Sequence, residues 1–148
     1  MVEKISVKVV IKELSTKEEM LQAYEIIKQR YQEMSLENFK EQISEMIKFS
    51  DFKMIAAFID EKIVGVTGYF IAHMLYCGRY IQLSSFIVDE EKRGAGIGKK
   101  ILQEVARIGK KQNCDKIVLD SFTENKKSHA LYYREDFYIR GFHFMKNL

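Results

Sequence analysis

The sequence predicts an α/β (α+β) fold, in which helices cover both faces of a central mixed, mostly antiparallel sheet. The first observation is the order of hydrophobic patterns along the chain, β-α-α-β-β-β-α-β-α-β. The second is that the three central strands are joined by short turns, which makes them antiparallel neighbours. The third is that a helix separates the next two strands, and such a right-handed crossover joins parallel strands. Since the chain has 148 residues, we expect one domain over residues 1–148.

The first third of the chain carries one strand and two helical segments. Residues 6–14 alternate between apolar and polar side chains, as a half-buried strand does. Thr16 and Glu19 have the spacing of a capping box and start a helix. Its apolar residues recur at helical spacing as far as Tyr31, and a second helix begins near Ser35.

Three strands follow in the middle of the chain. Residues 54–59 and 63–73 flank a polar turn at residues 60–62, so we expect an antiparallel hairpin. A turn at residues 77–79 then leads into a third strand at residues 80–88.

Helices and strands alternate in the last part of the chain. An apolar stripe predicts a helix over residues 97–112 whose apolar face packs on the sheet. A short buried strand is expected at residues 116–120, and a helix at residues 125–134. We expect a last strand at residues 137–144, with the apolar side chains Ile139, Phe142 and Phe144.

A glycine-rich loop connects the third central strand to the long helix. Gly94, Gly96 and Gly98 alternate with small or apolar residues, so the backbone can approach a ligand closely. The amides of this loop converge at a helix N-terminus, where the partial positive charge favours an anion. Because Arg93 and Lys99 add formal positive charge, we expect the loop to bind a phosphate.

Several patterns compete for this loop, including an ordinary glycine-rich turn. The P-loop pattern G-x-x-x-x-G-K-[ST] fails because Arg93 stands at its first glycine. The dinucleotide pattern G-x-G-x-x-G begins at Gly94, but Lys99 replaces its last glycine. A third pattern, [RQ]-x-x-G-x-[GA], is matched completely by Arg93, Gly96 and Gly98. It resembles the acetyl-CoA-binding motif of the GNAT superfamily of N-acetyltransferases.

A second motif strengthens this resemblance. Asn125, Ser128, Tyr132 and Phe137 have the spacing of the pattern N-x-x-[AS]-x-x-x-Y-x-x-x-G-F, which many GNAT enzymes carry on the helix after the crossover strand. One departure is Asp136, which replaces the glycine that usually ends this helix in a left-handed conformation, and Asp tolerates that conformation better than most residues. With the order of elements, the resemblance covers nearly the whole chain.

The resemblance implies an enzyme that transfers an acetyl group from acetyl-CoA to a primary amine, directly within a ternary complex. It implies that the parallel strands splay apart and that the pantetheine arm lies between them like an added strand. We expect the bulge that opens this splay at Ser84 and Ser85, which interrupt the apolar run. The implied cofactor-binding residues are Phe86, Ile87, Val88, Arg93, Gly94, Ala95, Gly96, Ile97, Gly98, Lys99, Asn125, Ser128 and Tyr132.

The same resemblance implies the catalytic roles. Tyr132 is the candidate general acid, because a tyrosine hydroxyl held against the sulfur can protonate the leaving thiolate. A backbone N–H near Phe86 or Ile87 is implied as the donor to the oxyanion. Gln82 stands where some relatives have a glutamate base, so Asp120 and a chain of waters remain the alternatives for deprotonating the amine.

The acceptor amine is not fixed by the sequence. The side chains that could line its pocket are Tyr31, Met34, Phe39, Tyr76 and Phe142. Small polyamines, aminoglycosides, amino acids and protein amines are all compatible with the pattern, and so are acyl groups other than acetyl.

Composition excludes several other classes. The net charge is +3 without a dense basic stripe, so we expect no nucleic-acid partner. The apolar runs are too short to span a bilayer, and residues 1–5 lack a signal-peptide core, so we expect no membrane association and a cytoplasmic location. The cysteines Cys77 and Cys114 lack metal-ligand spacing with the histidines, so we expect no metal.

Two other functions stay open at this point. A non-catalytic acyl-CoA-binding sensor would use the same phosphate-binding loop, and a nucleotide-dependent oxidoreductase would use the incomplete dinucleotide pattern. Exposed edge strands make a homodimer possible.

Overall fold

A five-stranded sheet forms the centre of the computed structural model, which describes residues 7–148. Its order is β1-β2-β3-β4-β5, with β1 to β4 antiparallel and β5 parallel to β4. The strands are β1 (Val10–Leu14), β2 (Lys53–Ile59), β3 (Lys62–Met74), β4 (Gly78–Val88) and β5 (Lys116–Val118). The expected fold class is therefore confirmed. Ser6, in the expected first strand, lies outside the described residues.

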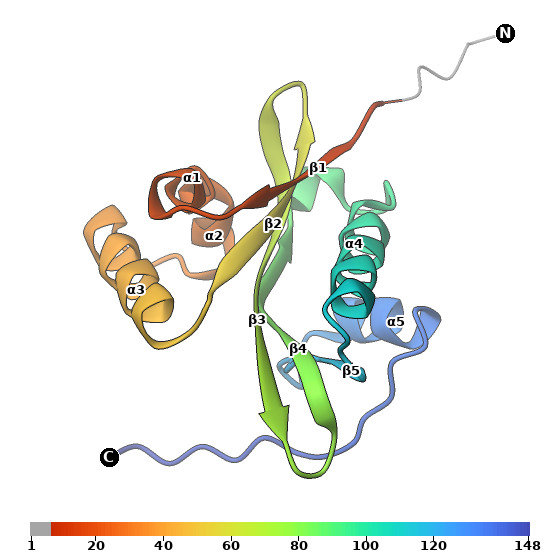
Figure 1. Cartoon of the computed structure of the whole chain (residues 1–148). Helices are drawn as coiled ribbons and strands as arrows, with labels where there is room; N and C mark the ends of the chain where they lie inside the picture. Colours follow the sequence, from red (N-terminus) through yellow and green to blue (C-terminus); the bar gives the residue numbers. More distant parts are fainter. Residues whose placement is uncertain (1–6) are drawn as a thin grey trace, which may run out of the picture.

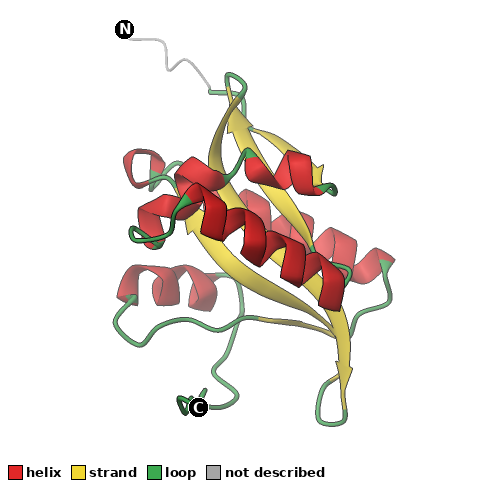
Figure 2. Ribbon diagram, turned by 90° about the vertical axis from the view of Figure 1, so that its left-hand side faces the viewer, coloured by secondary structure: helices red, strands yellow, loops and turns green. Residues whose placement is uncertain are grey.

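Helices cover both faces of this sheet. On one face lie α1 (Lys17–Leu21), α2 (Tyr24–Arg30) and α3 (Leu36–Phe49), and on the other α4 (Ile97–Lys111) and α5 (Lys126–Arg134) (Figure 1). Figure 2 views the molecule from the side of α1 to α3, with α4 and α5 behind the sheet. Each face has its own cluster of buried apolar side chains.

Hydroxyl side chains cap two of the helices, at the predicted capping box and at the predicted second helix start. The amide of Glu19 donates to the Thr16 hydroxyl at 3.1 Å, and the amide of Asn38 donates to the Ser35 hydroxyl at 3.1 Å. The first expected helix is interrupted, because the amide of Ala23 bonds back only three residues, to the carbonyl of Met20. This tight turn separates α1 from α2.

A bulge in β4 lies where the sequence predicts it. Val66 is opposite Ile87, but Gly68 is opposite Ser84, so two residues of β4 face one residue of β3. Ser85 has a left-handed φ of 57°. The β4–β5 ladder has only three pairs and ends at Gln82, after which β4 continues to Val88 paired with β3 alone.

The expected last strand is absent, so this prediction is wrong. After α5 the chain turns through Asp136, whose φ of 63° is the left-handed conformation expected there. Residues 137–148 then form neither helix nor strand, and their trace leaves the body of the protein (Figure 1). An alternating segment becomes a strand only when a neighbour supplies hydrogen bonds, and none pairs with it here.

Candidate functional site

The glycine loop between β4 and α4 exposes its backbone. A short 3₁₀ turn (Glu90–Lys92) follows β4, and Gly96 caps α4. Gly94 and Gly96 have φ values of 85° and 76°, which disfavour any side chain, and a Cβ at either position would meet no atom within 4 Å. The loop is therefore accessible, and the positive φ angles are what require glycine there.

The start of α4 presents unused amides to this loop. The amide of Lys100 donates to the Gly96 carbonyl at 3.1 Å. The amides of Ile97, Gly98 and Lys99 precede it and have no acceptor among the described residues. With the helix dipole they form a site for an anion. The Lys99 ammonium, also in this first turn, lies 3.9 Å from the Glu135 carboxylate.

Close packing at Gly98 fixes the position of this helix start. A Cβ there would lie 2.9 Å from Leu131 Cδ2, 3.4 Å from Phe86 Cζ and 3.6 Å from Val88 Cγ2. Because glycine leaves that space free, α4 approaches both β4 and α5 closely. The amides of α4 are therefore held beside the end of β4.

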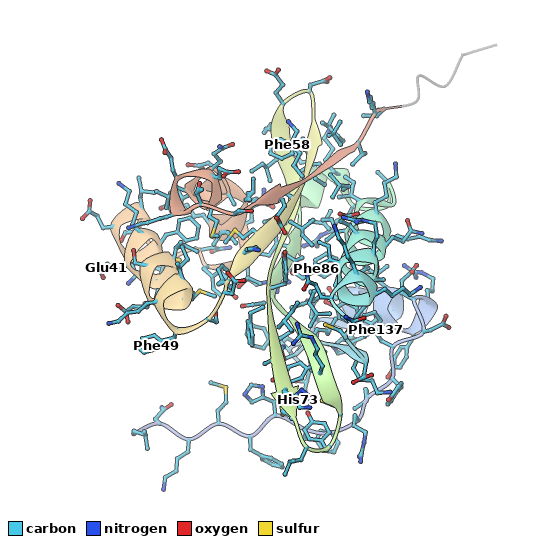
Figure 3. The ribbon with its side chains drawn as sticks, viewed as in Figure 1. Glu41, Phe49, Phe58, His73, Phe86 and Phe137 are labelled. Atoms are coloured by element: carbon cyan, nitrogen blue, oxygen red, sulfur yellow. The ribbon has the colours of Figure 1, made fainter. Side chains whose placement is uncertain are left out.

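The bulge in β4 contacts the helical layer of α1 to α3, on the face of the sheet opposite α4. The Tyr31 hydroxyl lies 2.9 Å from Ser85 Oγ, so the end of α2 contacts the bulge residue directly. Phe86, the next residue, is buried on the side of α4 and α5 (Figure 3). The bulge thus joins elements from both faces at one point of β4.

Tyr132 is enclosed by aromatic rings. Its ring centroid lies 6.2 Å from that of Phe86 and 5.7 Å from that of Phe137. Burial raises the pKa of Tyr132, while the positive charge of Arg30 and a hydrogen bond with Ser128 act in the opposite direction. Its hydroxyl is therefore protonated at neutral pH and can act as a donor.

A pocket of about 310 Å³ opens where β4 and the segment after β5 diverge. Three of its lining residues were predicted from the sequence, which are Arg93, Ile87 and Asn125. The others are Gln29, Arg30, Glu90, Phe122 and Glu124. Elements from α2 to the start of α5 thus meet at the end of β4.

Sequence reasoning missed the residues that α2 contributes. Arg30 lies on the polar side of a helix, as any solvated residue does, and no local signal brings it to the loop after β5. Gln29 holds α2 beside the turn after β4, since its side-chain oxygen accepts a hydrogen bond from the Glu90 amide at 3.3 Å.

Ser121 was also missed. Its Oγ is buried and has no hydrogen-bond partner among the described residues. A buried hydroxyl without a partner costs free energy unless a bound group satisfies it. The next residue, Phe122, lines the pocket, so this hydroxyl lies beside the pocket although Ser121 is not among its lining residues.

Other candidates lie apart from the pocket. Asp120 is 60% exposed, and its carboxylate lies 3.3 Å from His143 Nδ1. The Gln82 side chain donates to the Leu83 carbonyl at 3.0 Å. Of the acceptor candidates, Tyr31, Met34 and Phe39 share the buried cluster under α1 to α3. Tyr76 and Phe142 are exposed and lie apart from it.

Residues 7–148 contain neither a helix that could span a membrane nor a cluster of metal-ligating side chains. No helix among them is long and apolar enough to cross a membrane. No group of three or more potential metal-ligating side chains occurs in the same part of the chain.

The comparisons with known proteins identify the class. The sequence model of the acetyltransferase (GNAT) family matches residues 18–137, so the chain belongs to this family. Among curated proteins, the thialysine N-epsilon-acetyltransferase of Bos taurus is 34% identical over 70 residues, which are 47% of this chain and 41% of that protein. The match thus spans less than half of that relative. An uncharacterized N-acetyltransferase of Bacillus subtilis, YhdJ, is 20% identical over 122 residues, 82% of this chain and 86% of that protein.

Solved structures share the fold along almost the whole chain. An aminoglycoside N-acetyltransferase in complex with CoA has a TM-score of 0.80 and 17% identity, with 99% of this chain and 100% of that chain covered. An acetyltransferase of Trypanosoma brucei has a TM-score of 0.76 and 20% identity, with 95% and 100% covered.

Proposed function

We propose that this protein is an N-acetyltransferase that moves an acetyl group from acetyl-CoA to a primary amine within a ternary complex. The observation that carries the proposal is the open, glycine-built start of α4 beside a pocket that Arg93 and Asn125 both line. Because α2, β4 and the segment before α5 all contribute to this pocket, we propose that the chain acts as one acetyltransferase domain. A homodimer is part of the proposal.

The cofactor would be held by its charge and by its amide-like arm. The amides from Gly94 to Lys99, with Arg93, would bind the pyrophosphate. The backbone of Phe86, Ile87 and Val88 beyond the bulge would pair with the pantetheine arm, as an added strand pairs with a sheet edge. Asn125, Ser128 and the unsatisfied Ser121 hydroxyl would contact it from the other side.

The chemical step requires one proton to leave the amine and one to reach sulfur. The neutral amine attacks the thioester carbonyl carbon, a C–N bond forms, and the C–S bond breaks. A backbone N–H near Phe86 or Ile87 would stabilise the oxyanion. Tyr132 would donate its proton to the departing sulfur and recover one through solvent.

We assign removal of the amine proton to water. Gln82 carries no carboxylate, and Asp120 is exposed beside His143 and is not among the residues that line the pocket. Most of the rate enhancement would come from holding the two substrates in line, since such alignment lowers the entropic barrier.

Thermal unfolding with added ligands tests this function. Acetyl-CoA and CoA should each raise the midpoint, while NAD and ATP should not. A ligand at about a hundred times its dissociation constant adds about 2.7 kcal/mol to the free energy of unfolding. Stabilisation by NAD, or by none of the four, would contradict the proposal. Thiol release with a panel of amines then identifies the acceptor class.

A second candidate is a sensor that binds acyl-CoA without catalysis. The observation that favours it is Gln82, which lies in the position of a base but cannot accept a proton usefully. Binding of acetyl-CoA without thiol release for any amine, and an identical response of the Tyr132→Phe variant, would support the sensor instead.

A further inference from the structure

A second pocket, of about 450 Å³, lies at the end of α4 that is remote from the glycine loop. Strands β1 to β4 form its floor, and the turns of α4 from Glu104 to the C-cap Gln112 form one wall. Its lining residues are all different from those of the pocket beside the glycine loop. Binding sites for small molecules commonly have volumes of about 300–1,000 Å³, so this pocket is large enough to hold one.

Apolar side chains line the middle of this second pocket. Ile71 follows Tyr69 on the same face of β3. Ile108 lies one turn after Glu104 on α4. Both isoleucines are half-buried and pack against the buried cluster that includes Tyr69. The middle of the pocket therefore suits an aliphatic chain, which loses contact with water there.

One end of the pocket is acidic. The Tyr69 hydroxyl donates to Oε1 of Glu13, and Oε2 of Glu13 accepts a hydrogen bond from Ser15 Oγ at 3.0 Å. Burial raises the pKa of Tyr69, as do the hydrogen bond with Glu13 and the negative charges around it, which include Asp51 and Glu104. Three carboxylates therefore face this hydroxyl. Because a carboxylate has about four lone pairs, Glu13 can accept further hydrogen bonds.

The basic side chains at this acidic end already have partners. Lys53 Nζ lies 3.8 Å from Asp51 Oδ2. Arg107 donates to both oxygens of Glu104, from Nε at 3.0 Å and from Nη2 at 2.6 Å. Within residues 7–148, no basic side chain lies at ion-pair distance from Glu13. The Glu13 carboxylate is therefore the group that this end offers to a ligand with a positive charge.

The other end of the pocket is basic. Arg79 Nε donates to the Gln112 carbonyl at 2.8 Å, which holds the guanidinium against the C-terminus of α4. The Lys111 ammonium is on the last turn of the same helix. Neither cation has a carboxylate at ion-pair distance in the part of the chain that the structure describes. Since the two Nη groups of arginine match the geometry of a carboxylate, this end offers a site for one.

The acidic and basic ends are several residues apart. Arg79 is opposite His73, four residues beyond Tyr69 on β3, which is about 13 Å along an extended strand. Glu104 and Lys111 are seven residues apart on α4, which is about 10 Å along a helix. Long side chains reach inward from both ends and shorten the gap between the charges. A ligand that satisfies both ends must therefore carry opposite charges separated by a chain of several bonds.

We propose that this second pocket binds a small zwitterion, an amino acid whose ammonium and carboxylate groups stand at opposite ends of an aliphatic chain. The ammonium group lies at Glu13, and the carboxylate lies between Arg79 and Lys111. The chain packs on Ile71 and Ile108. This binding does not depend on the acetyltransferase activity, because the pocket shares no residue with the proposed acetyl-CoA site.

NMR titrations of the isotope-labelled full chain, without acetyl-CoA, test this proposal. The ligand 6-aminohexanoate should shift the amides of β3 and of the last turns of α4. It should bind more tightly than γ-aminobutyrate, whose chain is too short to reach both ends. Hexylamine and hexanoate each carry only one of the two charges, and each should bind about tenfold more weakly, the usual effect of losing a hydrogen bond to a charged group.

Two variants test the two ends separately. Lys111→Gln and Glu13→Gln should each weaken binding of 6-aminohexanoate by about tenfold, because each removes a charge that faces the ligand. Both residues are exposed, and glutamine keeps an oxygen that can accept from Tyr69, so the fold should survive. The matched controls remove the same charges outside the pocket. Lys110→Gln on α4 and Glu18→Gln on α1 should leave the affinity unchanged.

Three results would overturn the proposal. The first is the absence of shifts at this pocket with every ligand at millimolar concentration. The second is equal affinity for 6-aminohexanoate, hexylamine and hexanoate, which would mean that the pocket recognises the chain and not the charges. The third is equal weakening by the two variants and their controls, because the net charge of the protein would then control binding. Since acetyl-CoA is absent throughout, none of these results bears on the acetyltransferase activity.

Discussion

The two strands that border the pocket, β4 and β5, are held in different ways. β4 is paired on both sides, is tied to α2 through Ser85, and is packed against α4 at Gly98. β5 has three pairs with β4 and a free outer edge. Contacts with β3, α2 and α4 thus position the glycine-loop side. The side that carries α5 is held instead by side-chain contacts, namely Leu131 against Gly98 and the Tyr132 ring against Phe86 and Phe137. Changes near β4 should therefore affect stability and binding, and changes on α5 should affect catalysis.

The largest effect is expected on the α5 side. Tyr132→Phe should lower kcat by about 100- to 10,000-fold, the usual contribution of a general acid. The phenyl ring keeps its place between Phe86 and Phe137, so acetyl-CoA should stabilise the variant as before. Steady-state kinetics and thermal unfolding measure the two effects separately. The control is Tyr133→Phe, since Tyr133 is exposed. Equal kcat in both variants would remove Tyr132 from the mechanism.

The next largest effect is expected on the β4 side. Gly98→Val should lower the free energy of unfolding by about 1–3 kcal/mol, because its Cβ would meet Leu131 at 2.9 Å and its branches would overpack the contact with β4. The displaced helix start should also weaken acetyl-CoA binding. Chemical denaturation and ligand-induced shifts of the unfolding midpoint measure both.

The matched control places the same side chain on an exposed helical position. Ala130→Val on α5 should cost less than about 1 kcal/mol, which is the propensity difference alone, and should leave binding unchanged. If Gly98→Val were as mild as this control, close packing at Gly98 would not position α4.

Features predicted correctly from the sequence are those determined by neighbouring residues. The cap at Thr16, the helix start near Ser35, the central hairpin and the bulge at Ser84 and Ser85 each follow from a few consecutive side chains. The left-handed Asp136 follows from the resemblance to the family's motif. Arg30 and Ser121 could not be found this way, because packing of segments far apart in the chain brings Arg30 to the pocket and buries Ser121 Oγ next to the lining residue Phe122. The last strand was predicted wrongly, since its pattern is that of a strand but its pairing partner is not supplied by the protomer.

Loss of the hydrogen bond between Tyr31, at the end of α2, and Ser85 in β4 should have a smaller effect. Tyr31→Phe removes the contact with Ser85 Oγ at 2.9 Å and should lower the free energy of unfolding by about 1 kcal/mol. Because this contact holds the bulge, the affinity for acetyl-CoA should fall as well. Denaturant titration and calorimetry measure these changes, with Tyr76→Phe on the exposed hairpin tip as the control. A loss of stability with unaltered affinity would show that the bulge holds its shape without Tyr31.

The smallest effect is a shift in the pH dependence of catalysis. The positive charge of Arg30 favours the ionised form of Tyr132 and so lowers its pKa against the larger opposing effect of burial. In Arg30→Met the pKa of Tyr132 should rise. If the protonated hydroxyl is the catalytic form, activity persists to higher pH. The pH at which kcat falls on the alkaline side, measured at saturating acetyl-CoA, should therefore rise. Arg134→Met, on the exposed end of α5, should leave this pH unchanged. A shift of this decline to lower pH, or an equal shift in both variants, would mean that a group other than Tyr132 controls it. The catalytic role proposed for α5 would then have to be reassigned.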